Sequence, residues 1–513
     1  MATKKNSVLL KNIGLGLALG GILTLGYSAV FDLEGAGFLW SCLLALLLGG
    51  SLYSYALYRD SLPGIHNDGV WFNALTNRGV WGWLLGLGLT AFYITIYFYP
   101  TLLGYHSEGK NSGLVAFFDP LSVLLNGRAA TQWFVYGCLY TLAILLFGVK
   151  FMFKYRTEKY QVLRTLSIMF FQLGFAFLIP ELLAKLNGDA PYFAKDLKNM
   201  WPLNYYFFEE WHLDGMLQGG SLGLLMLGFG LAMIFVISPV LTYFYGKRWY
   251  CSWVCGCGGL AETAGDPFRQ LSSKKISVWK LERWMIHLVL VFITTTTLAV
   301  LWTYTADENN ALGLQQRTLW YGALLFFLSL LALLGGYYRK NLPTDARYAM
   351  YSVFALVLIT LVMRGWNGQN PLFGVSGYQL RAWYGFGFGA VFSGVLGVGF
   401  YPLLGSRVWC RFGCPMAAIL GLQQRLFSRF RITSNGGQCI SCGNCSSYCE
   451  MGIDVRQYAQ RGENIVRSSC VGCGICATVC PRGVLRLENE GAQNRLNDPV
   501  LPMGNLLKTT QNG

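Results

Sequence analysis

Eight cysteines near the end of the chain have a spacing that could hold metal. They lie in two runs, CISCGNCSSYCE at 439–450 and CVGCGICATVCP at 470–481. Each run reads C-x2-C-x2-C-x3-C, the ligand spacing of paired [4Fe–4S] clusters, in which the fourth cysteine of each run binds the cluster of the other run. The sequence therefore predicts two [4Fe–4S] clusters. Cluster site I comprises Cys439, Cys442, Cys445 and Cys480, and cluster site II comprises Cys470, Cys473, Cys476 and Cys449.

This arrangement is typical of a bacterial two-cluster ferredoxin, and such clusters usually transfer electrons. Paired C-x2-C units also form tetrahedral zinc sites. Two complete four-cysteine runs favour iron–sulfur clusters over zinc. Glu450 follows the first run where proline would be usual. We expect that difference to change the turn and not the ligand set.

A second group of cysteines lies in two similar stretches, KRWYCSWVCGCGG at 247–259 and SRVWCRFGCPMAA at 406–418. Each stretch follows a long apolar segment, and the alignment pairs Gly246 with Gly405 and Arg248 with Arg407. It also pairs the two cysteines of each C-x3-C motif, so the chain from about 219 to 420 looks like a duplicated unit. If the repeats pack about a pseudo-twofold axis, their thiols converge at one membrane face. The predicted metal-binding residues there are Cys251, Cys255, Cys410 and Cys414, with Cys257 as an extra thiol that could replace Cys255.

The chemistry of these membrane-edge cysteines stays open between three alternatives. They could bind a third iron–sulfur centre, bind or reduce copper, or act as two redox-active dithiols. Arg248, Arg407 and Arg411 lie close by in sequence, and we expect their charges to stabilise thiolates.

Long apolar segments occupy most of the chain. Of its 513 residues 54% are hydrophobic and only 13% are charged, and segments of about 20 apolar residues are long enough to cross a bilayer as helices. The predicted fold is therefore mainly α, a polytopic membrane helical bundle of about ten transmembrane helices with a small C-terminal α+β two-[4Fe–4S] ferredoxin domain. The predicted spans are 8–30, 36–58, 80–100, 132–153, 164–183, 219–246, 285–305, 318–338, 347–363 and 384–404.

The formal net charge of +15 comes from basic residues that cluster in short loops between apolar segments. This distribution follows the positive-inside rule and argues against a nucleic-acid partner. The loop around Lys154 and Lys159 is basic, whereas Glu209, Glu210 and Asp214 lie in an acidic loop. We therefore place the basic loops and both termini in the cytoplasm.

The composition divides the chain into four segments. We expect an N-terminal membrane domain of about five helices at 1–218 and a second membrane domain with the duplicated C-x3-C units at 219–430. A cytoplasmic two-cluster ferredoxin domain follows at 431–490, and a flexible tail at 491–513.

Paired C-x3-C motifs at helix ends, one of them followed by proline, and a C-terminal two-cluster ferredoxin resemble the NosR/NapH/CcoG group of membrane polyferredoxins. The resemblance covers about 219–485. It implies electron transfer through the bacterial cytoplasmic (inner) membrane to respiratory reductases or their maturation, and one branch of the group is linked to copper reduction for oxidase assembly. Gly256 stands where the first motif would have proline, and no large periplasmic domain is present.

The expected function is that of a membrane-bound iron–sulfur electron-transfer protein. Its partners would be soluble or membrane-bound donor and acceptor proteins, membrane lipid and a quinone. The alternative is a copper-reducing or metallocentre assembly factor that uses the C-x3-C thiols. A redox-sensing or structural subunit is a third alternative.

Overall fold

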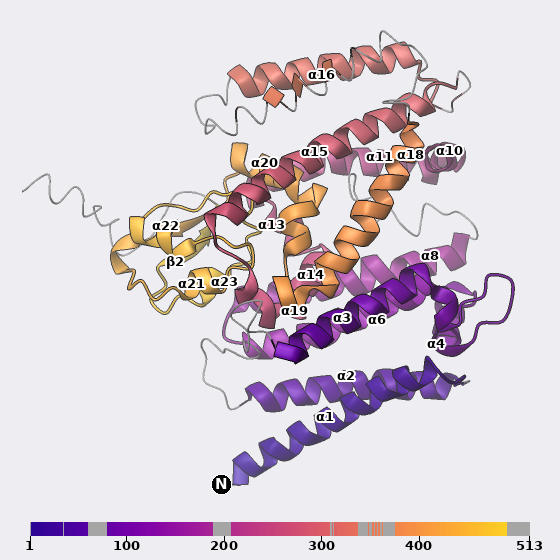
Figure 1. Ribbon diagram of the computed structural model, residues 1–513, viewed down its shortest axis with the longest axis vertical. Helices are drawn as coiled ribbons and strands as arrows, with labels where there is room; N and C mark the ends of the chain where they lie inside the picture. Colours follow the sequence, from indigo (N-terminus) through magenta and orange to yellow (C-terminus); the bar gives the residue numbers. More distant parts are fainter. Residues whose placement is uncertain are drawn as a thin grey trace, which may run out of the picture.

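The computed structural model describes residues 2–33, 35–59, 79–187, 207–307, 310, 312–336 and 375–489, with isolated positions between 347 and 362. Within these residues, nine helical segments are long and apolar enough to cross a membrane. The chain is thus a multi-pass membrane protein of mainly α-helical fold, as predicted (Figure 1). The segments are Ser7–Ser28, Ala36–Tyr58, Gly79–Phe98, Gln132–Lys154, Lys159–Leu186, Gly220–Tyr245, Ile276–Tyr304, Gln316–Leu333 and Gly377–Gly399.

These segments match nine of the ten predicted spans, because an uninterrupted apolar run of this length satisfies its backbone in lipid only as a helix. The remaining predicted span, 347–363, falls mostly outside the described residues. The spanning helices are α1 (Ala2–Ser28), α2 (Ala36–Tyr58), α3 (Gly79–Phe98), α6 (Gln132–Lys154), α7 (Lys159–Phe170), α11 (Gly220–Ala232), α12 (Ser238–Tyr245), α15 (Ile276–Tyr304), α16 (Gln316–Gly336) and α18 (Gly377–Tyr384). Three π-helical stretches extend or join them: η3 (Phe171–Leu178) between α7 and α8 (Ile179–Asn187), η4 (Met233–Ile237) between α11 and α12, and η7 (Gly385–Gly399) after α18.

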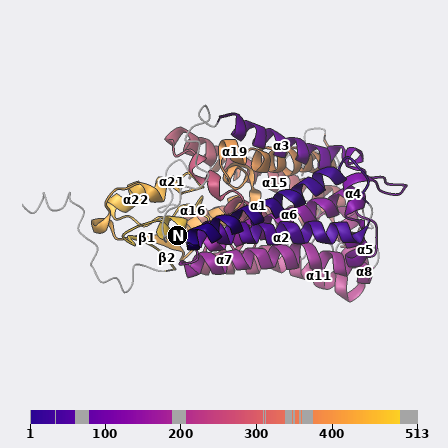
Figure 2. The same ribbon diagram turned by 90° about the horizontal axis from the view of Figure 1, so that it is seen from below.

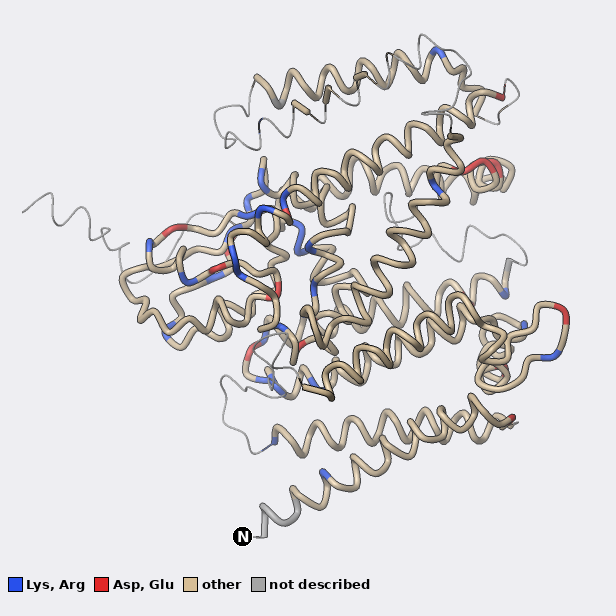
Figure 3. Tube along the Cα trace, in the orientation of Figure 1, with Lys and Arg blue, Asp and Glu red and all other residues tan. Residues whose placement is uncertain are grey.

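Charge is distributed unevenly along the helix axes. Figure 3 shows most Lys and Arg at the end of the helices that carries the C-terminal domain, while the acidic residues of α10 (Glu210–Gln218) lie at the opposite end. At that opposite end, Glu209 forms an ion pair of 2.6 Å with Arg381. The basic end is the one that the positive-inside rule assigns to the cytoplasm.

The helices before the first C-x3-C motif pack directly on it. Ile144 of α6 and Ile168 of α7 are fully buried against Leu260 and Ala261 of α14 (Gly256–Thr263). Tyr401 of α19 (Tyr401–Leu404), which precedes the second motif, belongs to the same buried group. Helices α6 and α7 therefore help to hold both motifs in place.

The π-helix η7 is anchored by α3. A π-helix bonds each amide to the carbonyl five residues back and is usually limited to a short bulge. Here the hydroxyl of Tyr93 donates to the carbonyl of Ala390 at 3.0 Å. The Tyr93 ring lies over Gly394, where an added Cβ would come within 1.9 Å of the ring. Any larger residue at position 394 would separate α3 from η7.

The C-terminal domain protrudes from the basic end of the helices (Figures 1 and 2). Strands β1 (Arg431–Ser434) and β2 (Leu485–Glu488) pair antiparallel, with Arg431 opposite Glu488 and Ser434 opposite Leu485. Between the two strands, the chain forms three short helices, α21 (Asn444–Ser447), α22 (Val455–Arg461) and α23 (Ile475–Thr478). The predicted small α+β domain is confirmed.

Candidate iron–sulfur site

The two predicted ligand sets of the C-terminal domain line two separate hollows. One hollow, of about 360 Å³, is lined by all four cysteines of cluster site I. The other, of about 390 Å³, is lined by all four cysteines of cluster site II. Cys480 thus joins the first run and Cys449 joins the second, which is the crossed pattern that the spacing predicts.

Matching backbone turns shape the two hollows. Gly443 and Gly474, each two residues before the third cysteine of its run, have φ of 80° and 79° and begin α21 and α23. A left-handed conformation of this kind is readily available only to glycine. The two cysteine runs therefore fold into the same loop, and each loop presents its first three sulfurs to one hollow.

Without a metal, burial favours the neutral thiol form of the cysteines in these hollows. Burial raises the pKa of Cys445 to about 11 and that of Cys470 to about 11. The backbone amide of Ile453 donates to the sulfur of Cys449 at 3.4 Å. Sulfurs that converge in a buried hollow and accept amide hydrogen bonds are stabilised as thiolates when a metal replaces their protons. The donor set fits two [4Fe–4S] clusters.

Cluster site II faces the membrane helices, and its loop is held by them. Four consecutive backbone carbonyls, from residue 470 to residue 473, each accept a hydrogen bond from a side chain outside the C-terminal domain. The donors are Gln424 to Cys470 (2.9 Å), Ser252 to Val471 (2.8 Å), Tyr160 to Gly472 (2.9 Å) and Gln161 to Cys473 (3.0 Å). Gly472 has φ of 65°, and an added Cβ would lie 2.6 Å from the Cβ of Arg248. The loop is thus fixed against the membrane domain along its whole length.

The two C-x3-C motifs adopt the same backbone conformation. Gly246 and Gly405, with φ of 64° and 98°, follow α12 and α19. Cys255 is the N-cap of α14 with φ and ψ of −68° and 123°, and Cys414 is the N-cap of α20 (Pro415–Phe427) with −78° and 114°. The amides of Cys255 and Cys414 donate to the carbonyls five residues earlier, at 2.8 Å and 2.9 Å. Gly256 and Pro415 both occupy the first helical position, where a missing amide hydrogen costs nothing, so Gly256 leaves the motif intact.

The paired motifs bring their cysteines into one group. Cys251 of α13 (Arg248–Cys251) and Cys410 of η8 (Trp409–Gly413) are buried, at 5% and 8% exposure. Burial raises the pKa of Cys414, and the neighbouring thiolates of Cys410, Cys251 and Cys255 raise it further. Cys257 is exposed and lies beside Cys255, with which it shares a hydrogen bond. All five predicted residues therefore interact with one another.

The membrane-edge cysteines and cluster site II belong to one continuous buried core. Cys251, Met416 and Ala417 from the motifs are buried together with Cys470, Val471 and Cys476 of the C-terminal domain. No membrane-spanning segment separates the two sites along the chain from 410 to 480. The membrane-edge cysteines and the cysteines of cluster site II therefore meet at one packed interface between the C-x3-C motifs and the C-terminal domain.

Only one of the three nearby arginines acts as expected. The Nη1 atom of Arg407 lies 3.7 Å from the Cys410 sulfur and 3.4 Å from the Cys251 carbonyl. Arg248 instead donates to Asn489 and lies over the Phe430 ring, and Arg411 pairs with Glu282 at 2.6 Å. The predicted stabilisation of thiolates is thus wrong for these two, because each finds a closer partner of its own.

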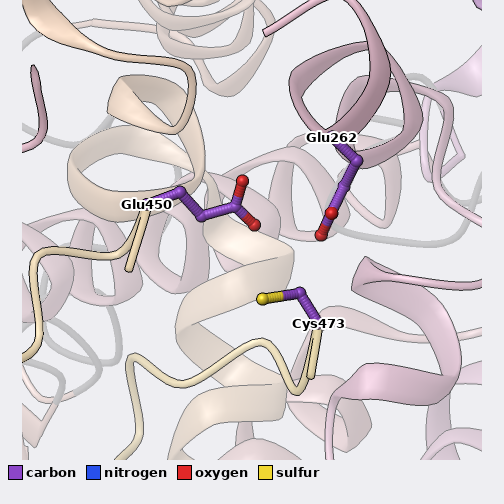
Figure 4. A group of neighbouring side chains, drawn as sticks. All are labelled: Glu262, Glu450 and Cys473. Atoms are coloured by element: carbon purple, nitrogen blue, oxygen red, sulfur yellow. The ribbon is translucent and has the colours of Figure 1, made fainter. Parts of the chain in front are cut away.

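A buried charge network lies between the two sites, and it was not predicted. Glu262 of α14 and Glu450 of the C-terminal domain point toward each other beside the sulfur of Cys473 (Figure 4). Arg269 bonds both carboxylates, at 2.9 Å each, and Arg407 also contacts both. Arg164 adds a further contact of 2.6 Å to Glu262.

This network is an ion-pair junction rather than a cation site. Burial alone would raise the pKa of Glu262, but Arg164, Arg269 and Arg407 lower it well below its usual value. Burial raises the pKa of Glu450 to about 7, and the neighbouring Glu262 contributes to that rise. Guanidinium groups already occupy the carboxylate oxygens that a metal ion would need. Glu450, the residue that replaces proline, thereby links the C-terminal domain to the membrane domain.

Comparisons with known proteins agree with both groups of cysteines. A family model described as a 4Fe-4S binding domain matches 227–278 and 386–433, which are the two halves of the proposed duplication. A second model, a 4Fe-4S dicluster domain, matches 438–485. The chain therefore carries 4Fe–4S ferredoxin-type domains, and the two [4Fe–4S] clusters predicted as its cofactors are confirmed.

Among curated proteins, the chain is similar to "Putative electron transport protein YccM" of Escherichia coli (strain K12). The two are 24% identical over 232 residues, which cover 45% of this chain and 48% of that protein. The chain thus matches about half the length of this relative. No solved structure gives a significant match.

Proposed function

We propose that the chain is a membrane-bound iron–sulfur electron-transfer protein. It would pass electrons between a cytoplasmic donor and a quinone or another membrane or periplasmic acceptor, as part of a respiratory or redox complex. All-cysteine [4Fe–4S] clusters exchange single electrons. The residues of the chain hold the two cluster sites and fix the ligand loop of cluster site II against the membrane domain.

The observation that carries this proposal is the set of four hydrogen bonds to the loop at 470–473. A soluble ferredoxin domain that was only tethered to the membrane would not need this contact. Here the ligand loop of cluster site II accepts hydrogen bonds from Ser252, inside the first C-x3-C motif, and from Gln424 of α20, the helix that begins after Cys414. Cluster site I has the exposed ligand Cys442. The order of sites supports a path from cluster site I through cluster site II to the membrane-edge cysteines.

The likeness to the NosR/NapH/CcoG group supports the same proposal at the level of the duplicated motifs. We also propose the four-segment division at 1–218, 219–430, 431–490 and 491–513, of which the last lies outside the described residues. The basic end of the helices supports a cytoplasmic location for the C-terminal domain and both termini, in a bacterial inner membrane.

Copper reduction is a second candidate, favoured by one observation. Cys257 has an exposed side chain and hydrogen-bonds with the half-buried Cys255, so the motif offers a further thiol in addition to the buried Cys251 and Cys410. Thiolate ligands select Cu(I), and an exchangeable copper site needs access from outside. In this case the two clusters would supply electrons to the thiol site.

Iron and sulfide analysis with EPR on the anaerobically purified protein separates the two candidates. The test variant replaces Cys251, Cys255, Cys410 and Cys414 with serine. Its matched control replaces Cys42 and Cys138, which are buried in α2 and α6 far from both sites. Electron transfer through a third centre predicts that wild type and control hold more iron than two cubes and that the test variant loses only the excess. If all three hold two cubes and wild type has titratable thiols instead, copper chemistry gains and the third centre is excluded.

A further inference from the structure

The face of the C-terminal domain over cluster site I has the features of a protein-docking surface. We propose that it binds a small soluble electron carrier, of the ferredoxin or flavodoxin kind, whose surface is acidic around its redox group. This proposal rests on the proposed function, since it names the class of donor and the place where the donor binds.

Cluster site I has an exposed ligand cysteine, and cluster site II does not. Cys442 is exposed, and its neighbour Ile440 is 54% exposed. Both residues line the hollow of cluster site I. In contrast, Cys470 and Cys476 of cluster site II are buried, and their loop is covered by the membrane domain. Within the part of the chain that the structure describes, an external protein can therefore approach cluster site I more closely than cluster site II.

The charged residues at this opening are basic. Among the described residues that line the hollow, the charged ones are Arg456 of α22 and Arg482, and both are exposed. Arg461 at the end of α22 and Arg486 of β2 are also exposed. Of the described acids in this domain, Glu450 is buried in the ion-pair junction, Asp454 and Glu488 are half-buried, and Glu463 is exposed. The four exposed arginines outnumber these last three acids, so positive charge predominates.

An exposed apolar centre within a basic rim is suited to a brief encounter. Ile440 and Pro481 provide apolar contact next to the ligand cysteines, and the arginines surround them. Complementary charge raises the association rate and orients the partner, while a small contact area allows rapid release. This combination fits an acidic electron carrier.

The position of this face favours a soluble acidic protein over anionic lipid headgroups as the partner. Helix α22 lies at the outer end of the domain in two perpendicular views, away from the membrane-spanning helices (Figures 1 and 2). Arg456 and Arg461 on this helix therefore cannot reach the headgroups of the membrane that holds the chain. Binding of RNA to the same face is one of the outcomes that the experiment below distinguishes.

The transfer step is a one-electron exchange without bond formation. The reduced carrier loses one electron and the C-terminal domain gains it. No proton or group is transferred between the two proteins. The arginines act only by positioning the carrier.

The experiment measures this step directly. The full-length protein in nanodiscs is mixed with a reduced acidic ferredoxin, and the bleaching of cluster absorbance is followed by stopped flow at several salt concentrations. The test variant is Arg456→Glu with Arg482→Glu. The matched control is Arg317→Glu, an exposed arginine of α16 at the opposite end of the helices. Photoreduced neutral deazaflavin serves as a reductant that needs no docking.

We expect the second-order rate constant to fall at least tenfold in the double variant and to lose most of its salt dependence. The control variant and the reduction by deazaflavin should match wild type. Equal rates and equal salt dependence in the double variant and wild type would overturn the proposal. It would also be overturned if the double substitution abolished binding of a single-stranded RNA but left the carrier rate unchanged.

A failure of docking can be told from a failure of the proposed function. If deazaflavin-reduced protein passes electrons to a quinone but the arginines have no effect on the carrier, only the docking surface is wrong. If deazaflavin-reduced protein passes electrons neither to a quinone nor to any other membrane or periplasmic acceptor, the proposed function itself fails, whatever the carrier does.

Discussion

Gln161 and Cys473 lie 312 residues apart in the chain, yet the side-chain amide of Gln161 donates to the carbonyl of Cys473 at 3.0 Å. Gln161 is fully buried near the start of α7, and Cys473 is a predicted ligand in cluster site II. The same Gln161 amide reaches Thr478 at 3.1 Å, and its carbonyl oxygen accepts a hydrogen bond from Arg164 at 2.7 Å. One side chain thus joins the first half of the chain, the charge network and the cluster loop.

Replacing Gln161 with alanine should loosen the cluster loop. The carbonyl of Cys473 would lose its donor, and an unsatisfied buried polar group costs about 1–3 kcal/mol. We expect faster amide hydrogen exchange across 470–478 and a lower temperature for loss of cluster absorbance. Gln457→Ala, at an exposed position on α22, is the control and should behave as wild type. Unchanged exchange in the Gln161 variant would show that the hydrogen bond does not hold the loop.

Glu450→Pro should weaken the junction between the domains although it restores the residue usual at this position of a ferredoxin. Arg269 and Arg407 would each lose a buried carboxylate partner, and breaking a buried ion pair from one side costs about 3–5 kcal/mol. Thermal loss of cluster absorbance should therefore occur at a lower temperature. Glu450→Gln, which keeps the side-chain volume, should also lower the temperature at which cluster absorbance is lost.

The control for this prediction is Glu463→Gln, an exposed acid in the same domain. The account of the junction is wrong if both Glu450 variants melt at the same temperature as this control.

Arg407→Gln should lower the reduction potential of the centre at the membrane-edge cysteines. The Arg407 guanidinium lies 3.7 Å from the Cys410 sulfur, and its positive charge favours the reduced, more negative state. Redox titration followed by EPR measures the potential. Arg248→Gln is the matched control from the aligned position, because Arg248 bonds Asn489 instead. A larger fall in the Arg248 variant than in the Arg407 variant would contradict this assignment.

Cys255 rather than Cys257 is expected to bind metal. Cys255 and Cys414 occupy equivalent N-cap positions, whereas Cys257 is already inside α14. Cys255→Ser should therefore lose the iron of the third centre, and Cys257→Ser should retain it. Iron analysis of the two purified single variants decides between them, and the reverse result would assign the ligand to Cys257.

The cysteine chemistry and the apolar spans were predictable because both are local in sequence. The spacing within 439–450 and 470–481 determines which sulfurs meet, and an apolar run reveals a helix by its length alone. The matching turns at Gly246 and Gly405 follow from the same local repeat. These features do not depend on which helix packs against which.

The charge network was not predictable because its members come from distant parts of the chain. The local sequence around Arg164, Glu262 and Glu450 does not indicate that these residues contact one another. Only the packing of α7, α14 and the C-terminal domain brings them together. Glu450 in place of proline was the one available signal. This signal predicts a changed turn, and it does not reveal the distant arginines that Glu450 contacts.

The most direct test of the central claim follows electrons from the C-terminal domain into the membrane. Protein in nanodiscs is reduced anaerobically by deazaflavin and mixed with a short-chain quinone, and the return of cluster absorbance is timed. The account predicts rapid reoxidation in wild type. It predicts at least tenfold slower reoxidation in the variant with serine at 251, 255, 410 and 414, with both clusters retained. Equal reoxidation rates in the two proteins would show that electrons leave without using the membrane-edge cysteines, and would contradict the account.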